Sequence, residues 1–137
     1  MFLAHMDGDG RPQTIFSHVA GVSALAETFA QSFGAQEQAR LAGLAHDVGK
    51  YSLAFQKRLE GDKRKVDHAT AGAVECWQMK QPFAAFVVAG HHGGLPNGGS
   101  PMDPPDDVTL CGRIKRKEAK QLEDYENYKT EVQLPQA

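Results

Sequence analysis

Histidines and aspartates that recur along this chain have the chemistry of metal ligands. They stand in four places: His18, His46-Asp47, Asp67-His68 and His91-His92. Imidazole nitrogens combined with carboxylate oxygens are the ligands of catalytic sites for divalent transition metals. The sequence therefore predicts a metal centre with these ligands: His18, His46, Asp47, His68, His91 and His92.

Asp47 and Lys50 are the candidate catalytic residues. Successive residues of a helix diverge by about 100°, so His46 and Asp47 reach one ion from different directions, or Asp47 bridges two ions. A carboxylate between two ions about 3.5–4 Å apart is the usual centre of a two-metal phosphodiesterase site. Gly49 is expected to end the helix and to place Lys50 toward the same hollow, as a phosphate and nucleic-acid contact. The alternative for Lys50 is a solvated surface lysine.

Helices are predicted to position these residues. Five segments show helical spacing of apolar residues or helix boundary signals: residues 14–33, 36–48, 52–59, 67–78 and 82–90. The boundary signals are candidate caps at Thr14 or Ser17 and at Ser52, a stop at Gly34 and a first-turn proline at Pro82. The histidines fall at or near the ends of these helices, and helix ends can converge on one hollow of a bundle. The expected fold is therefore an all-α helical bundle with the metal site at converging helix ends.

Apolar side chains at helical spacing predict which helix faces are buried. In the first helix these are Val19, Val22, Leu25 or Ala26, Phe29 and Phe33. Core packing is also favoured over base stacking for four aromatic residues: Phe55, Trp77, Phe83 and Phe86. Cys76 is expected to be a small buried hydrophobe. His5, near the N-terminus, is expected to support the fold or a ligand rather than to bind metal.

The remaining segments are predicted to contribute little to the core. Residues 93–105 are rich in Gly, Pro and Asn and are expected to form a flexible loop beside the histidines. Residues 113–137 form a charged tail, in which residues 113–129 have helical propensity but few apolar anchors. The basic residues 113–117 are followed by acidic ones, which favours a solvated mixed-charge helix over a nucleic-acid contact. Residues 1–137 are expected to form a single domain.

Composition limits the classes of function. The chain has 137 residues and a formal net charge of -2, so it is not a generally basic nucleic-acid binder. Contact with a phosphate backbone must come from local basic groups or from bound metal. Two cysteines make neither a disulfide framework nor a zinc pattern, which favours a reducing cytoplasmic location. No segment is apolar enough for a membrane span, and the N-terminus does not have the pattern of a signal peptide.

The histidine-containing blocks resemble the HD superfamily of metal-dependent phosphohydrolases. More narrowly, they resemble the HD nuclease domain of the CRISPR-associated type I interference nuclease-helicase. Besides His18, the blocks are residues 4–5, 44–56, 67–73 and 90–95, which read AH, LAHDVGKYSLAFQ, DHATAGA and GHHGGL.

This resemblance implies a mostly helical fold with two metal positions. One ion would be held by His18, His46 and Asp47, and the second by Asp47, His68, His91 and His92. It also implies cleavage of single-stranded DNA displaced during CRISPR interference, with a helicase component and an RNA-guided surveillance complex as partners. Ligation rich in histidine favours manganese, nickel, cobalt or iron over magnesium, which prefers oxygen ligands.

One block of the family pattern has no counterpart in this sequence. Members of the narrower family carry a further aspartate, late in a downstream helix, that completes the first metal position, and nothing after Leu95 resembles that block. The aspartates available there are Asp103, Asp106, Asp107 and Asp124. The chain also has no helicase motif, so it is expected to be a fragment or a shortened stand-alone partner.

Two alternative functions stay open at the level of the sequence. One is an HD phosphohydrolase acting on a nucleotide or cyclic nucleotide, which a narrow closed pocket would favour, whereas an open groove would favour the nuclease. The other is a turnover-deficient binding domain, which the metal content of the purified protein would distinguish from both enzymes.

Overall fold

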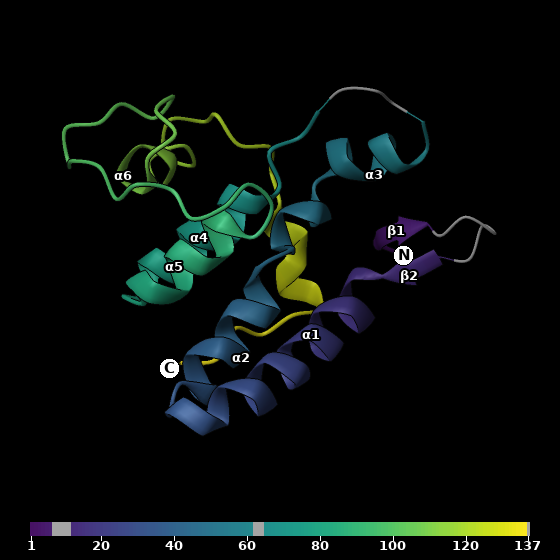
Figure 1. Cartoon of the computed structure of the whole chain (residues 1–137). Helices are drawn as coiled ribbons and strands as arrows, with labels where there is room; N and C mark the ends of the chain where they lie inside the picture. Colours follow the sequence, from purple (N-terminus) through teal and green to yellow (C-terminus); the bar gives the residue numbers. More distant parts are fainter. Residues whose placement is uncertain (7–11, 62–64, 137) are drawn as a thin grey trace.

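A computed structural model of the chain describes residues 1–6, 12–61 and 65–136, and these residues are mostly helical (Figure 1). The elements in order are β1 (Leu3–Met6), β2 (Pro12–Thr14), α1 (Ile15–Ala30), η1 (Gln31–Phe33), α2 (Gln36–Ala45), η2 (Val48–Tyr51), α3 (Leu53–Leu59), α4 (Ala69–Gln78), α5 (Pro82–Gly90), α6 (Leu110–Arg113) and η3 (Glu126–Thr130). The predicted helical fold is confirmed. The short antiparallel pair of β1 and β2 was not predicted.

The boundary signals of the helices act as the sequence predicts. The Thr14 hydroxyl accepts a hydrogen bond of 3.2 Å from a backbone N–H in the first turn of α1. Gly34 has a φ of 75° and ends η1 in the left-handed region that favours glycine. Ser52 caps α3 in the same way as Thr14 caps α1, and Pro82 lies in the first turn of α5.

Two helical hairpins, one of α1 with α2 and one of α4 with α5, form the body of the molecule (Figure 1). One hydrophobic core joins α2, α4, α5 and α6, and its members include Leu41, Ala45, Ala73, Cys76, Ala85, Val88 and Leu110. A second core joins β1, α1, η2 and the C-terminal segment, and its members include Ala4, Ile15, Val19, Val48, Tyr51, Tyr125 and Tyr128. The candidate ligands lie where the two hairpins meet.

Two glycines allow the hairpins to approach closely enough to share a site. A Cβ atom on Gly49 would overlap the backbone of His68, and one on Gly72 would overlap the backbone carbonyl of Ala45. The predicted role of Gly49 as a helix stop is wrong, because α2 already ends at Ala45 and Gly49 lies within η2. Its role is to let the start of α4 pack against η2.

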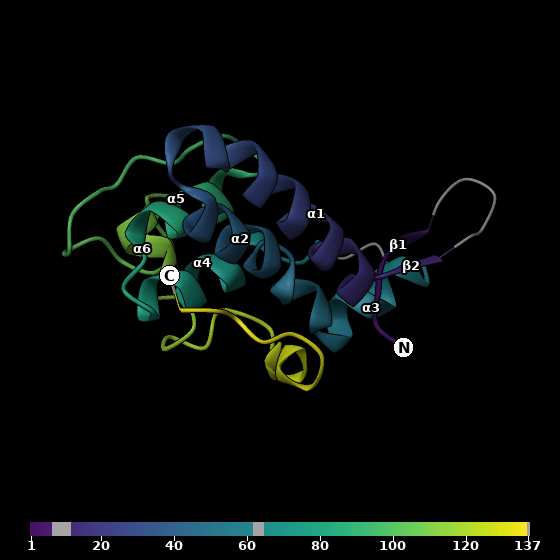
Figure 2. The same cartoon turned by 90° about the horizontal axis from the view of Figure 1, so that it is seen from below.

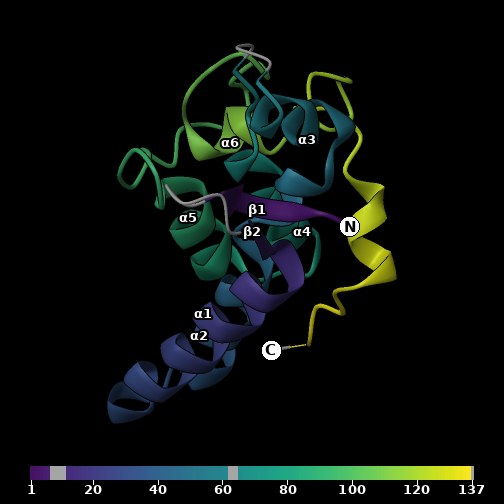
Figure 3. The same cartoon turned by 90° about the vertical axis from the view of Figure 1, so that its right-hand side faces the viewer.

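The predicted buried face of α1 is partly wrong. Val19 is buried, but the exposed fractions of the later side chains are 59% for Leu25, 71% for Phe29 and 73% for Phe33. Figure 3 shows that the far end of the α1–α2 hairpin extends beyond the other helices, so only α2 packs against α1 there. Two aromatic residues that were predicted to be in the core also lie at helix ends with few neighbours. Phe83 at the start of α5 is 70% exposed, and Trp77 at the end of α4 is 41% exposed. Phe55 and Cys76 are buried as predicted.

The C-terminal segment is not the charged helix that the sequence predicts. After α6 it has no further α-helix among the described residues, and Figure 2 shows it lying along one side of the bundle. Tyr125 and Tyr128 are buried and donate hydrogen bonds of 2.7 and 2.6 Å to the Glu75 carboxylate of α4. These buried anchors, contributed by residues some 50 positions apart, outweigh local helix propensity.

The basic residues of this segment are used to fasten it to the bundle. Arg116 donates a 2.8 Å hydrogen bond to Asp67, and the Lys117 amine lies 3.1 Å from carboxylate oxygens of both Glu75 and Glu126. The expected solvated mixed-charge helix is therefore wrong. Ion pairs with residues far away in the sequence hold this segment against the bundle. They replace the i,i+4 pairs that an exposed helix would form within itself.

The predicted loop at residues 93–105 forms no helix or strand. Its first half is tied to α6 by backbone hydrogen bonds from the N–H groups of Leu110 and Cys111 to the carbonyls of Asn97 and Gly98. Its flexibility stays a prediction. Across residues 1–6, 12–61 and 65–136, none of the helices has the length and apolar character needed to cross a membrane.

The Glu75 anchor makes the stability of the fold sensitive to alkaline pH. Burial and the hydrogen bonds to Glu75 raise the pKa of Tyr125 and of Tyr128. Because the folded pKa is the higher one, the stabilisation is complete below the unfolded pKa of about 10 and is lost as pH rises above it. We expect the free energy of unfolding, measured with urea, to fall above about pH 10.

Replacing both phenols tests this assignment. The Tyr125→Phe/Tyr128→Phe variant should be less stable at pH 8 by about 1–3 kcal/mol for each lost hydrogen bond to the buried carboxylate. It should also lose less stability above pH 10 than the unmodified chain. An unchanged alkaline slope would contradict the assignment of these two tyrosines as its source.

Candidate metal centre

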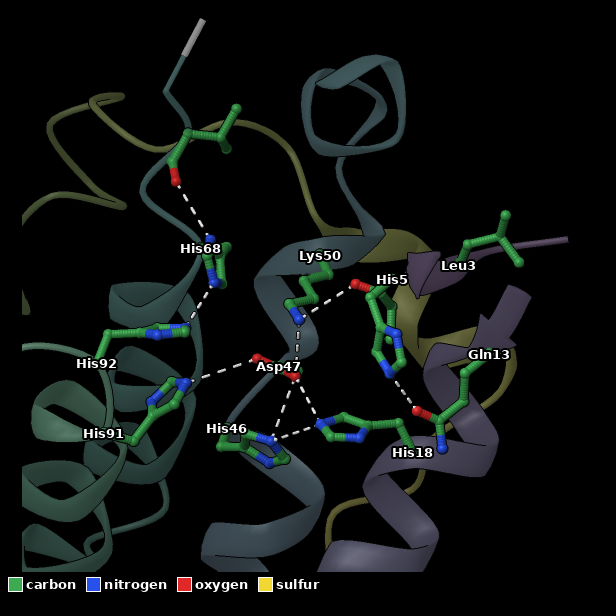
Figure 4. A network of polar contacts seen from close by, with 12 residues as sticks. Leu3, His5, Gln13, His18, His46, Asp47, Lys50, His68, His91 and His92 are labelled. Atoms are coloured by element: carbon green, nitrogen blue, oxygen red, sulfur yellow. Dashed lines mark hydrogen bonds and ion pairs between the residues drawn. The ribbon is translucent and has the colours of Figure 1, made fainter. Parts of the chain in front are cut away.

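All six predicted metal ligands come together at the junction of the two helical hairpins (Figure 4). Asp47 occupies the middle and is 2% exposed. The ligands come from helix ends: His18 from the start of α1, His46 from the C-cap of α2, His68 from the N-cap of α4, His91 from the C-cap of α5, and His92 from the residue after it. The predicted convergence of helix ends on one histidine–aspartate cluster is confirmed.

One group of ligand atoms surrounds the Oδ2 atom of Asp47. The Nε2 atom of His18 lies 3.0 Å from this oxygen, and the Nε2 atom of His46 lies 3.2 Å from it. The two nitrogens are themselves 3.1 Å apart. Three ligand atoms within this short range can hold one ion.

A second group of ligand atoms lies on the other side of the same carboxylate. It combines Asp47 with His68 and His92, whose Nε2 atoms are 2.8 Å apart. His91 belongs to neither compact group, but its Nε2 atom lies 3.6 Å from the Oδ1 atom of Asp47. Asp47 is therefore the residue that the two groups share.

Backbone carbonyls orient three of the histidine rings for metal binding. The Nδ1 atom of His46 lies 2.7 Å from the carbonyl of Gly43, and that of His91 lies 2.6 Å from the carbonyl of Val88. His68 makes a longer contact of the same kind. A nitrogen facing a carbonyl oxygen must carry the proton, so the neutral ring presents the lone pair of Nε2 to Asp47. This second hydrogen bond is the usual support of a metal-binding histidine.

The cluster contains more acceptors than donors. In their neutral forms His46 and His91 direct Nε2 lone pairs at a carboxylate, and the buried Oδ1 atom of Asp47 has no hydrogen-bond partner among the described residues. Lone pairs facing one another at this range repel unless a proton or a metal cation lies between them. The donor set and this unsatisfied oxygen both fit a divalent transition metal.

The electrostatics of the cluster favour the charge states that metal binding requires at Asp47, His18, His68 and His92, whereas at His46 the Asp47 carboxylate outweighs burial and raises the pKa of the ring. Burial opposes the charge on Asp47, but the ring nitrogens of His46 and His91, which can donate to it only from protonated rings, and the Lys50 amine outweigh burial and lower the pKa of the carboxyl group. Burial lowers the pKa of His68 to about 4, so this ring is neutral at neutral pH. Burial also lowers the pKa of His18 and of His92. Neutral imidazoles and an ionised carboxylate are the ligand forms that bind metal.

Lys50 lies at the site and not on the surface. Its side chain is 12% exposed, with the amine 3.2 Å from the Oδ2 atom of Asp47 and 3.3 Å from the carbonyl oxygen of Ala4. The alternative of a solvated surface lysine is therefore wrong. Its roles in catalysis and in phosphate binding stay predictions.

The neighbouring candidates have supporting positions. His5 contacts Gln13 at 2.5 Å, and its ring meets that of His18 edge-on with 6.1 Å between the centroids. Asp67 is turned away toward Arg116. Among the described residues, the two possible ion-binding groups include none of the later aspartates: Asp103, Asp106, Asp107 and Asp124.

Sequence reasoning missed the backbone carbonyls of Gly43 and Val88. Each lies three residues before a histidine that follows the end of a helix, and the last carbonyls of a helix have no partner within it. A histidine just after a predicted helix end is the sequence signal that would have identified these contacts.

The shared position of Asp47 leads to a prediction about metal binding. We expect titration calorimetry with Mn²⁺ to show one tightly held ion, on Asp47, His68 and His92 with His91 beside them. A weaker ion would occupy His18, His46 and a share of Asp47. His92→Ala should weaken the tight site and His18→Ala the weak one, each by at least the 10- to 100-fold that follows loss of a supporting group.

Asp106→Asn is the control for this titration, because it removes an exposed carboxylate that belongs to neither group and should leave both ions bound. Two equally tight ions in the unmodified chain would contradict the expected asymmetry. They would mean that another residue completes the position at His18.

Comparison with known families agrees with this geometry. The family model described as HD domain matches residues 15–133, a range that contains all six candidate ligands. A search of curated proteins found no match to this chain. The family match covers most of the sequence and supports the superfamily of phosphohydrolases, in which a histidine–aspartate cluster binds divalent metal. This chain belongs to the HD domain family.

Proposed function

We propose that this chain is a metal-dependent phosphodiesterase that cleaves single-stranded DNA in CRISPR interference, alongside a helicase component and an RNA-guided surveillance complex. The observation that carries the enzymatic part is the buried Asp47 carboxylate shared between two groups of histidines. Membership of the HD domain family supports metal-dependent phosphohydrolase activity. The narrower assignment rests on the sequence blocks around these residues.

The residues of the cluster have distinct roles in this proposal. Asp47 holds both positions together, with His18 and His46 on one side and His68, His91 and His92 on the other. Bound ions at such a site lower the pKa of water and neutralise charge on a phosphate. Lys50 places its amine beside Asp47, where it can hold a phosphate oxygen. The five histidines favour manganese, nickel, cobalt or iron over magnesium.

An open hollow beside His68 and His92 supports a polynucleotide over a mononucleotide as substrate. One hollow of about 490 Å³ is bounded by His68 and His92, and another of about 380 Å³ is bounded by His46 and His91. The first hollow suits a charged strand better, because the second is lined mainly by apolar side chains of α1, α2 and α5. A pocket built for a single nucleotide would instead be closed on one side.

Removing the central ligands tests the assignment of the metal centre. We expect His46→Ala and Asp47→Ala each to abolish metal-dependent cleavage of DNA while leaving helical content, measured by circular dichroism, largely intact. Asp106→Ala removes an exposed carboxylate outside the cluster and should cleave at the unmodified rate. Near-normal turnover of Asp47→Ala would contradict the shared-carboxylate mechanism.

A second prediction concerns the form of the substrate. We expect faster cleavage of single-stranded than of double-stranded DNA of equal length at matched salt. With a formal net charge of -2 the chain has little basic surface for a rigid duplex, whereas a flexible strand can bend into the metal centre. Faster cleavage of a blunt duplex would contradict the proposed substrate.

A further inference from the structure

Arg113, the last residue of α6, carries a half-buried charge that makes no ion pair with the carboxylates of the described residues. Its Nε atom donates a 3.0 Å hydrogen bond to the Thr70 hydroxyl, and Nη1 donates one of 3.0 Å to the carbonyl of Ala89. Both acceptors are neutral. Within residues 1–6, 12–61 and 65–136 the guanidinium makes no ion pair, and three of its five N–H groups have no partner.

Three other half-buried cations have carboxylate partners, and a fourth, Lys115, instead donates hydrogen bonds to the backbone carbonyls of Pro101 and Asp103. The shortest contacts are 3.2 Å from Lys50 to Asp47, 2.8 Å from Arg116 to Asp67, and 3.1 Å from Lys117 to Glu75. A charge taken partly out of water is normally paired or bound to a ligand. Arginine cannot lose its proton to relieve this constraint. The unpaired charge of Arg113 therefore indicates a place for an anion.

The position of Arg113 links this place to the metal centre. Its two acceptors belong to Thr70, two residues after His68, and to Ala89, three residues before His92. Arg113 lines the same hollow of about 490 Å³ as these two histidines. Asp67 also lines this hollow, but its charge is already paired with Arg116.

We propose that Arg113 is a phosphate-binding residue of this site. In the single-stranded DNA of the proposed function, on which this inference rests, it holds a phosphate next to the one at Asp47, His68 and His92. The free N–H groups form a fork that suits two phosphate oxygens. Sequence patterns favoured a solvated helix here, so only the fold reveals this role.

Binding measured without turnover tests the proposal. Fluorescence anisotropy would follow a labelled single-stranded oligothymidylate in chelator, over a range of salt concentrations, and calorimetry would follow inorganic pyrophosphate. We expect Arg113→Gln to weaken binding of the oligonucleotide about 10- to 100-fold, as for loss of hydrogen bonds to a charged group. The slope of log affinity against log salt should decrease by about 0.7, the value for one phosphate contact on a single strand. Manganese binding should not change.

Two control variants separate phosphate binding from a structural role. Arg58→Gln removes the same charge from an exposed position on α3 and should bind as the unmodified chain does. Thr70→Val removes one hydrogen bond that ties Arg113 to α4 but keeps the guanidinium, and should also retain affinity. Equal weakening in Thr70→Val and Arg113→Gln would assign Arg113 to fastening the helices and would overturn the proposal.

The remaining outcomes distinguish this inference from the proposed function. If the oligonucleotide does not bind but pyrophosphate binds only when Arg113 is present, the phosphate site stands and the DNA substrate is wrong. If the oligonucleotide is bound and cleaved equally well by Arg113→Gln, the nuclease stands and the role of Arg113 is wrong. Failure of the unmodified chain to bind either probe overturns the phosphate site.

Discussion

A carboxylate removed from water must find donors or cations, since an uncompensated buried charge costs several kcal/mol. Asp47 imposes this constraint at the centre of the molecule, where it is 2% exposed. Lys50 supplies one cation, and the histidines supply nitrogens whose lone pairs point the wrong way unless protonated or metal-bound. One Asp47 oxygen has no hydrogen bond among the described residues. The Asp47 carboxylate therefore requires a nearby cation, and its own oxygens are ligands that can bind one.

The fold supplies the ligands because two helical hairpins end at the same point. Gly49 and Gly72 let the start of α4 approach η2 and α2, and this contact brings His68 beside Asp47. Backbone carbonyls near the ends of α2 and α5 then orient His46 and His91. The helix ends therefore have two roles: they point the ligand residues toward one place, and their last carbonyls orient two of the histidine rings. Side chains with larger volume at the two glycines would separate the hairpins and divide the metal ligands.

Local sequence signals predicted the parts of the fold that depend on local interactions. The caps at Thr14 and Ser52 and the stop at Gly34 depend on atoms a few residues away, and all three were identified. The residues of the histidine–aspartate cluster were also singled out, because their types are those of metal ligands and they fall near predicted helix ends, but their role as ligands stays a prediction. The C-terminal segment was not, since Tyr125 and Tyr128 bind a glutamate some 50 residues earlier. Phe29 and Phe33 have helical spacing but project beyond the helices that would cover them, and spacing alone cannot show this.

The central claim is that Asp47 shares one carboxylate between two cation positions. Crystals grown with Mn²⁺ would test it most directly, through anomalous scattering at the manganese edge. We expect anomalous peaks within coordination distance of the Asp47 carboxylate, the stronger toward His68 and His92 and the weaker toward His18 and His46. Manganese bound elsewhere, or no peak at Asp47 at saturating concentration, would contradict it.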